Sequence, residues 1–142
     1  MRLFFSIMAT SALLLTACSE QGTETSEPSA DAQSKWNVKD VDAATAQKLL
    51  AGNKELRVLD IRTPQEYAEG HIAGALNVDF KAANFAEELA KLDKDQAYIL
   101  HCRSGRRSTK ALPILKDNHF STIYHLNNGF NDWKDSGMLT AP

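Results

Sequence analysis

The chain has 142 residues, with 16 Lys and Arg side chains against 18 Asp and Glu side chains and a formal net charge of −2. Arg2 and four carboxylates precede residue 35, so residues 35–142 carry 15 cations against 14 carboxylates. This balance excludes a broad basic face, and we expect no nucleic acid partner. Residues 35–142 are long enough for one compact domain and too short for two.

Residues 1–17 have the pattern of a secretory signal peptide. Arg2 supplies a positive charge, residues 3–15 form an apolar stretch, and small residues follow. A bilayer-spanning helix needs about 20 apolar residues, so the shorter stretch favours a cleaved signal over a membrane-spanning anchor. The residues LTAC, which end at Cys18, resemble the lipobox of bacterial lipoproteins and imply that Cys18 is lipidated. Ordinary cleavage nearby, which leaves Cys18 as a free thiol, is the alternative.

Residues 18–34 are expected to be a lipidated cysteine followed by a disordered tether, because residues 19–34 contain no aromatic or large aliphatic side chain. We therefore expect an exported lipoprotein on the periplasmic side of a bacterial membrane, held by its lipid alone. Ser19 stands where an aspartate commonly retains lipoproteins at the inner membrane, which favours the outer membrane. With Cys18 lipidated, Cys102 is the one free thiol. A lone thiol in an oxidising compartment indicates chemistry rather than structure.

Residues 35–142 show short apolar runs that alternate with helical segments. The expected strands are nearly continuously apolar, as in strands covered on both faces, and lie at residues 56–61, 97–102 and 122–126. The expected helices lie at residues 42–52, 63–70, 83–93 and 108–118, with a last helix around Trp133 that packs onto the core. The alternation predicts an α/β fold with a parallel sheet.

Two of these helices have clear start signals. Asp42 is expected to cap the first helix, which ends at Gly52. Thr63 is expected to cap the second helix, with Pro64 at its first position and Glu66 completing a capping box. Side-chain chemistry alone therefore predicts where both helices begin.

The segment CRSGRRS, residues 102–108, contains the candidate site. Cys102 ends the strand 97–102 at the carboxyl edge of the predicted sheet, where ligands bind in such folds. Ser104 and Gly105 allow successive backbone N–H groups to turn inward, with a helix amino terminus behind them. Inward amides, a helix dipole and nearby guanidinium groups favour an anion, and they also stabilise a thiolate over a thiol. We therefore expect Cys102 to be a nucleophile beside a site for an anionic substrate.

This loop resembles the active-site loop of rhodanese-like sulfurtransferases, C-x-x-G-x-R-S, and the upstream stretch LDIRTPQEYAEGHIAGALNV is similar to the family's other signature, with D-x-R, G-H-I and G-A-x-N. Together the motifs cover almost all of residues 35–142. The resemblance implies a rhodanese-like domain, with a central parallel sheet and helices on both faces. It also implies a cysteine that takes a sulfane sulfur from a small anionic donor such as thiosulfate, forms a persulfide, and passes the sulfur to cyanide or a thiol. No metal or organic cofactor is implied, and we expect a monomer.

Carried over by position, the resemblance makes Cys102 the nucleophile and persulfide carrier. Arg103 and Arg106 either steer a dianion at the mouth of the pocket or are plain solvated charges. Arg107 is expected to brace the loop or to bind substrate oxygen. The substrate-binding set that the resemblance implies is Arg103, Ser104, Gly105, Arg106, Arg107 and Ser108.

Asp60 and Arg62, at the end of their own strand, are expected to hold neighbouring loops through hydrogen bonds rather than to perform chemistry. His101 precedes the nucleophile in sequence and invites assignment as a general base. Because adjacent strand residues point to opposite faces, we expect its imidazole to turn away from the thiol.

The other histidines have no predicted catalytic role. His71 follows a helix end and is expected to pack against it or cap it. No motif places His119 or His125. Because no acidic or cysteine partner lies at metal-ligand spacing, we expect no metal site.

Three positions depart from the family pattern. Asn118 and Asn128 stand where glycine is common, and asparagine tolerates the left-handed conformation that glycine would adopt there. Pro113 lies inside the predicted helix 108–118, where it removes a backbone donor and should kink the helix. The helix start, which supports the thiolate, precedes the proline.

Two other functions fit much of the same sequence. Cysteine-dependent phosphatases and arsenate reductases also place a thiolate under inward amides and an arginine, but they have C-x5-R, whereas Cys102 to Arg107 gives C-x4-R. A noncatalytic module that carries a persulfide or binds a partner is the second alternative.

Overall fold

The structure, a computed structural model, describes residues 35–142. The signal peptide expected at residues 1–17 and the lipidated cysteine and tether expected at residues 18–34 lie outside the described residues. No helix among residues 35–142 combines the length and the apolar character needed to cross a membrane.

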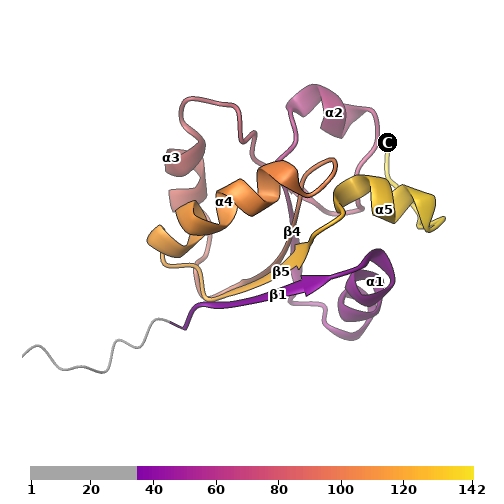
Figure 1. The fold of residues 1–142 in the computed structure, drawn as a ribbon, viewed down its shortest axis with the longest axis horizontal. Helices are drawn as coiled ribbons and strands as arrows, with labels where there is room; N and C mark the ends of the chain where they lie inside the picture. The colour runs from indigo at the N-terminus through magenta and orange to yellow at the C-terminus, as the bar shows by residue number, and fades with distance from the viewer. Residues whose placement is uncertain (1–34) are drawn as a thin grey trace, which may run out of the picture. The chain divides into compact units, whose positions relative to one another are not determined.

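A five-stranded sheet forms the centre of the fold (Figure 1). In spatial order its strands are β1 (Asn37–Val41), β5 (Thr122–Leu126), β4 (Ala97–His101), β2 (Arg57–Asp60) and β3 (Leu76–Asn77). Every neighbouring pair is parallel, so all the carboxyl ends meet at one edge, with β4 in the middle. The predicted α/β fold with a central parallel sheet is confirmed.

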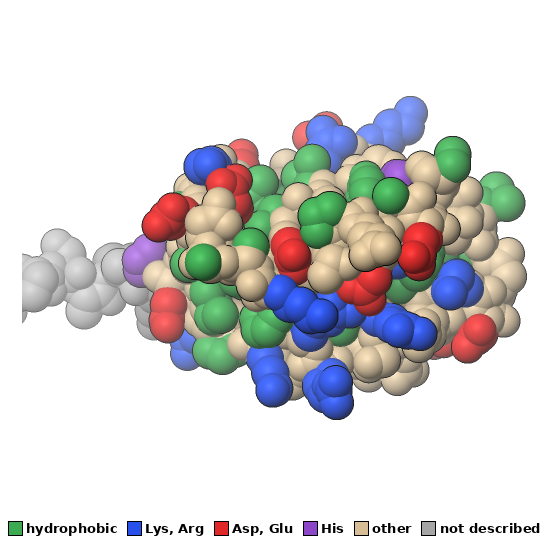
Figure 2. Space-filling model, turned by 90° about the horizontal axis from the view of Figure 1, so that it is seen from above, with side chains coloured by type: hydrophobic (Ala, Val, Ile, Leu, Met, Phe, Trp, Pro, Cys, Tyr) green, Lys and Arg blue, Asp and Glu red, His purple; other side chains and the backbone are tan. Residues whose placement is uncertain are grey.

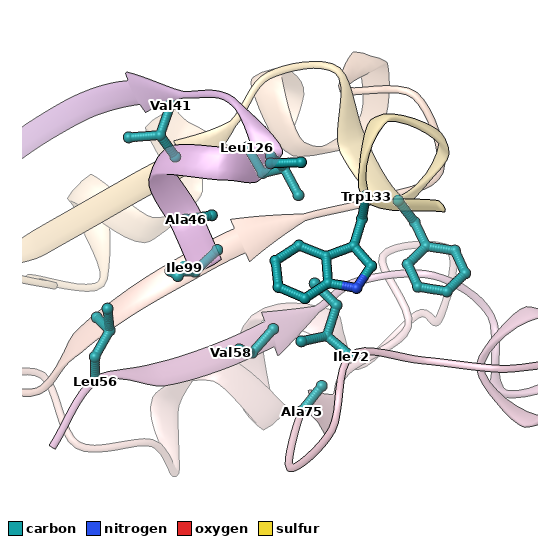
Figure 3. Close-up of a cluster of buried hydrophobic side chains, with 11 residues drawn as sticks. Val41, Ala46, Leu56, Val58, Ile72, Ala75, Ile99, Leu126 and Trp133 are labelled. Carbon is teal, nitrogen blue, oxygen red and sulfur yellow. The ribbon is translucent and has the colours of Figure 1, made fainter. Parts of the chain in front are cut away.

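Helices cover both faces of this sheet. Within residues 35–142 they are α1 (Ala43–Gly52), α2 (Pro64–Ala68), α3 (Phe85–Ala90), α4 (Arg106–Asp117) and α5 (Gly129–Asp135). α3 and α4 contribute to the apolar cluster on one face, and α1 and α5 contribute to the cluster on the other. In the second cluster, buried Trp133 of α5 lies beside Ile72 (Figure 3). The prediction that Trp133 packs its helix onto the core is therefore confirmed.

The strand β4 shows why its sequence is almost continuously apolar. Ile99 packs into the cluster under α1 and α5, whereas Tyr98 and Leu100 pack into the cluster under α3 and α4. Each is 2% exposed or less. Complete burial of such a side chain contributes about 1.5–3 kcal/mol, so both faces of β4 stabilise the strand that leads to Cys102.

Two strands escaped prediction from the sequence. β1 lies at a sheet edge, and its residues Lys39 and Asp40 are exposed, so it lacks a continuous apolar run. β3 lies at the other edge and is only two residues long. Edge strands need less apolar surface than central ones, so neither strand has the apolar run that predicts a buried strand.

The predicted helix caps are confirmed. The Asp42 carboxylate accepts a hydrogen bond from the Thr45 N–H at 2.8 Å, and α1 ends at Gly52. At the start of α2, the Thr63 hydroxyl accepts from the Glu66 N–H at 3.2 Å, and the Glu66 carboxylate accepts from the Thr63 N–H at 3.1 Å. This reciprocal pair fixes the position of Glu66, whose carboxylate is also part of the candidate site.

The expectation that Asn118 takes a left-handed conformation is wrong. Asn118 has φ −84°, and the left-handed residue is His119, with φ 62°. The His119 N–H donates to the Lys116 carbonyl at 2.9 Å, and the Phe120 N–H donates to the Leu115 carbonyl at 3.1 Å. This is the hydrogen-bond pattern of a Schellman motif, whose left-handed residue follows the C-cap rather than occupying it.

Pro113 does not end α4, which runs from Arg106 to Asp117 as one helix. The proline is exposed and lies about two turns beyond Gly105, the N-cap residue. The amides of the first turn, which face the candidate site, therefore precede any disturbance that the proline causes.

Candidate functional site

Cys102 lies directly after β4, at the carboxyl edge of the sheet. Its side chain is 1% exposed and belongs to the apolar cluster beneath α4, with Leu100 and Ala111 in the same cluster. His101 points to the opposite face, where its ring stacks on Phe130 with 5.9 Å between centroids. Burial lowers the pKa of His101. The imidazole therefore turns away from the thiol, as predicted.

The loop after Cys102 closes through a left-handed glycine. Gly105 is the N-cap of α4 and has φ 84°. Its carbonyl oxygen accepts hydrogen bonds from the Thr109 N–H at 2.9 Å and from the Ser108 hydroxyl at 2.8 Å. A Cβ on Gly105 would lie 1.6 Å from the carbonyl oxygen of Asn127, so only glycine fits at this turn.

The carbonyl groups of the loop are held by α5. The N–H of Phe130 donates to the Cys102 carbonyl at 2.8 Å, and the N–H of Asn131 donates to the Arg103 carbonyl at 3.0 Å. These donors belong to the first turn of α5, whose amides have no partner within the helix. Because the carbonyls bond to α5, the following amides are free to face the sulfur.

The glycine that permits this close approach is Gly129, with φ 68°, and not the residue before it. A Cβ on Gly129 would lie 2.6 Å from the carbonyl carbon of Arg103. Asn128, expected to be left-handed, has φ −92°. That expectation is wrong because the turn requires its left-handed residue at the contact with the Cys102 loop, one position later.

The electrostatic environment of the sulfur favours the thiolate. Burial by itself raises the pKa of Cys102, but hydrogen bonding from the amide and hydroxyl of Ser108 and from the amides of Ser104 and Arg107 outweighs it. The pKa of Cys102 is therefore lowered. The amides come from the loop and from the first turn of α4, where the helix dipole also favours an anion.

Arg107 is held by a carboxylate that the sequence reasoning had assigned only to a helix cap. Its guanidinium donates to the two Glu66 carboxylate oxygens at 2.8 and 2.7 Å, a bidentate pair. These hydrogen bonds lower the pKa of Glu66 to about 2. They also raise the pKa of Arg107, to which the nearby Cys102 contributes. Glu66 thus links α2 to the Cys102 loop and positions the guanidinium near the sulfur.

An open cleft of about 770 Å³ lies over the loop. The exposed side chains of Arg103 and Arg106 line it, together with Ser104 and Arg107 of the same loop. Lys81 and Lys110 add two cations, against the two carboxylates Glu66 and Glu69. Figure 2 shows basic and acidic side chains side by side on the face that contains α2, α3 and α4. The cleft is therefore suited to a small anion.

Asp60 and Arg62 form a buried ion pair next to the site. The Arg62 Nε lies 3.0 and 2.9 Å from the two carboxylate oxygens of Asp60. The guanidinium also donates to the carbonyl oxygens of Glu66 at 3.0 Å and Gly70 at 2.9 Å, and it lies 3.9 Å from the centroid of the Phe130 ring. The pair therefore connects the end of β2 to α2 and α5, away from the sulfur.

Two further histidines have contacts that the sequence did not predict in detail. His71 Nδ1 lies 3.2 Å from the Tyr67 carbonyl oxygen, and the imidazole stacks on the Tyr67 ring with 3.8 Å between centroids. His71 therefore packs against the end of α2. His125 Nε2 lies 2.9 Å from the Ser108 hydroxyl. No sequence motif marks His125. The only available signal was its place on β5, the strand beside β4.

The part of the chain that the structure describes holds no group of three or more His, Cys, Asp or Glu side chains that could bind a metal ion.

The site is a thiol enclosed by amides at the carboxyl edge of a parallel α/β sheet. The family model described as "Rhodanese-like domain" matches residues 42–136, and the chain belongs to the rhodanese-like family. The crystal structure of a rhodanese-related protein from Thermoplasma volcanium matches 72% of this chain and 97% of its own, with a TM-score of 0.64 and 26% identity.

Curated relatives carry sulfurtransferase names. "Thiosulfate sulfurtransferase GlpE" of Pseudomonas fluorescens is 39% identical over 77 residues, which cover 54% of this chain and 69% of that protein. "Probable adenylyltransferase/sulfurtransferase MoeZ" of Mycobacterium tuberculosis is 37% identical over 84 residues, 59% of this chain. The match spans only 21% of the length of MoeZ. The similarity therefore places the domain in a family of sulfurtransferases.

Proposed function

We propose that this protein is a sulfurtransferase that moves a sulfane sulfur from thiosulfate or a persulfide donor, through a persulfide on Cys102, to cyanide or a thiol. The observation that carries the proposal is the enclosure of one thiol by the amides of Ser104, Arg107 and Ser108, which lower its pKa. A thiolate is the nucleophilic form that sulfur transfer requires.

The reaction needs no cofactor to balance. The Cys102 thiolate attacks the outer sulfur of thiosulfate, the sulfur–sulfur bond of thiosulfate breaks, and sulfite leaves with the bonding electron pair. The product is a Cys102 persulfide anion, which the loop amides stabilise as they stabilise the thiolate. Cyanide then attacks the outer sulfur, thiocyanate leaves, and the Cys102 thiolate is restored.

The cleft supports an anionic donor. Arg103 and Arg106 lie at its surface and raise the local concentration of a dianion, whereas Arg107 interacts with Cys102 and is oriented by Glu66. The thiosulfate sulfurtransferase name of the Pseudomonas fluorescens relative supports the same donor. The four residues between Cys102 and Arg107 also make a shorter loop than the C-x5-R of phosphatases and arsenate reductases.

The test is thiocyanate formation from thiosulfate and cyanide by the purified protein. We expect turnover by the wild type and none by Cys102→Ser, whereas Cys18→Ser serves as a matched control and retains full activity. No turnover by the wild type with thiosulfate, persulfide donors, cyanide or thiols would exclude the enzyme and favour a carrier or binding module. Hydrolysis of a phosphate ester or reduction of arsenate that depends on Cys102 would instead favour the alternative enzyme class.

We also propose that the domain acts outside the cytoplasm as a lipoprotein. The apolar stretch before Cys18 and the LTAC pattern support this proposal. Labelling of cells with a fatty acid analogue tests it, because the label should be absent from Cys18→Ala and present on the wild type.

A further inference from the structure

A series of polar contacts leads from the sulfur through Ser108 into the protein, beyond the groups that the proposed reaction uses. The Ser108 hydroxyl lies 3.6 Å from the Cys102 sulfur and 2.9 Å from His125 Nε2. On the far side of the ring, His125 Nδ1 lies 2.8 Å from a carboxylate oxygen of Asp40. Ser108 is fully buried and His125 is 3% exposed, so these polar contacts are screened from water except at Asp40.

The order of the strands builds this series of contacts. β5 lies between β1 and β4, and His125 pairs with Asp40 of β1 on one side and with Leu100 of β4 on the other. His125 is two residues after Ile123, whose side chain packs beneath α4, so the imidazole points to the same face. Ser108 descends from the first turn of α4 to meet it.

The number of protons limits what these groups can do together. The single hydroxyl proton of Ser108 has three acceptors within reach, which are the Gly105 carbonyl at 2.8 Å, the Cys102 sulfur and His125 Nε2. When His125 is neutral with its proton on Nδ1 toward Asp40, Nε2 is free to accept a hydrogen bond from the Ser108 hydroxyl. When His125 is doubly protonated, Nε2 donates to Ser108, and the hydroxyl proton turns to the Cys102 sulfur or to the Gly105 carbonyl.

We propose that His125 is a positioning residue that, through Ser108 and with Asp40 behind it, holds the proton released when Cys102 becomes a thiolate. In this step the S–H bond of Cys102 breaks and its proton passes to Ser108 Oγ, while the Ser108 hydroxyl proton passes to His125 Nε2. Serine is left unchanged, the thiolate accepts a hydrogen bond from it, and the imidazolium forms beside the Asp40 carboxylate. The proposal rests on the proposed sulfurtransferase function only because that function uses the thiolate. The proton transfer itself needs no substrate.

Charged groups on β1, α4 and α2 act on His125 and Cys102. Asp40 of β1 faces the His125 ring, and Cys102 faces it through the α4 hydroxyl. The sulfur in turn faces Arg107, whose charge is paired with Glu66 of α2. Arg107 favours the thiolate independently of His125, so changes at His125 should weaken thiolate formation without abolishing it.

The test is the rate of Cys102 alkylation by iodoacetamide against pH, in the full chain, with the Cys102 peptide quantified by mass spectrometry. An opposite charge about 4–6 Å away shifts a titration by roughly 1–3 pH units. Because the contact runs through Ser108, we expect His125→Asn to move the alkylation midpoint upward by about one unit, which means about tenfold slower alkylation below the midpoint. His119→Asn is the matched control, since His119 is exposed and asparagine tolerates its left-handed backbone.

Asp40→Asn provides the second variant, because its side chain is 63% exposed and its replacement should not prevent folding. We expect a smaller upward shift than for His125→Asn, and none for Asp117→Asn, an exposed aspartate on α4. Midpoints for His125→Asn and Asp40→Asn that coincide with those of their controls would overturn the proposal and leave His125 a packing residue. Alkylation requires no sulfur donor, so a shifted midpoint without thiocyanate formation would count against the proposed function alone.

Discussion

Replacement of Gly105 by alanine should damage the loop that encloses the sulfur. Gly105 has φ 84°, a conformation that costs a residue with a Cβ about 1–2 kcal/mol. The new Cβ would also lie 1.6 Å from the carbonyl oxygen of Asn127, far inside the usual contact distance of about 3.5 Å. Because the Asn127 oxygen belongs to the backbone and cannot rotate away, the segments around Gly105 and Asn127 must separate, at an overpacking cost of about 1–3 kcal/mol. We expect a total loss of about 2–5 kcal/mol in the free energy of unfolding.

Two other glycines separate these contributions. Gly137 has φ 71° and open space around its Cβ position, so Gly137→Ala should show the backbone cost alone, about 1–2 kcal/mol. Gly52 lies at the end of α1 with no atom within 4 Å and no positive φ, so Gly52→Ala should gain about 0.5–1 kcal/mol. Urea unfolding of the variants measures all three. A Gly105→Ala loss equal to that of Gly137→Ala would refute the close packing against Asn127.

Three further predictions concern charge and attachment. Arg103→Ala or Arg106→Ala should mainly raise the KM for thiosulfate, and added salt should weaken thiosulfate binding by the wild type more than by either variant. Equal salt sensitivity of the KM in all three proteins would indicate that the two side chains are only solvated charges. Cys18→Ala should release the protein from membranes or block its processing, with thiosulfate turnover unchanged, and lost turnover would contradict a pure anchor. Glu66 has a folded-state pKa of about 2 against an ordinary 4.5, so its stabilisation is present above 4.5 and lost as pH falls toward 2. The wild type should therefore lose more of its free energy of unfolding than Glu66→Gln as pH falls from 4.5 toward 2. The same pH dependence of the free energy of unfolding in both proteins would contradict the pairing with Arg107.

The sequence predicted the central part of the fold because burial leaves a direct mark on composition. β4 and β5 are apolar over most of their length, β2 is apolar at its two central residues Val58 and Leu59, and the caps at Asp42 and Thr63 use local hydrogen bonds that a few adjacent residues specify. The edge strands β1 and β3 have no such mark, since solvent covers part of their surface. Local signals therefore predicted the elements that carry the site and missed those at the rim.

The candidate site also combines features that a short segment predicts with contacts between distant elements that it does not predict. The placement of Cys102 at a strand end and the inward amides after it follow from a short segment, and the segment was enough to predict them. The partners Glu66 and His125 come from α2 and β5, and their contacts depend on how distant elements pack. Pairwise contacts of this kind leave no periodic or motif signal in a single sequence, so they required the structure.

The most direct test of the account is the mass of the Cys102 peptide after the protein is incubated with thiosulfate. We expect this peptide to gain the mass of one sulfur atom, sulfite to be released in equal amount, and cyanide to remove the added sulfur as thiocyanate. A Cys102 peptide of unchanged mass in a protein that still forms thiocyanate would contradict the account, because the sulfur would then travel by a route that does not include Cys102.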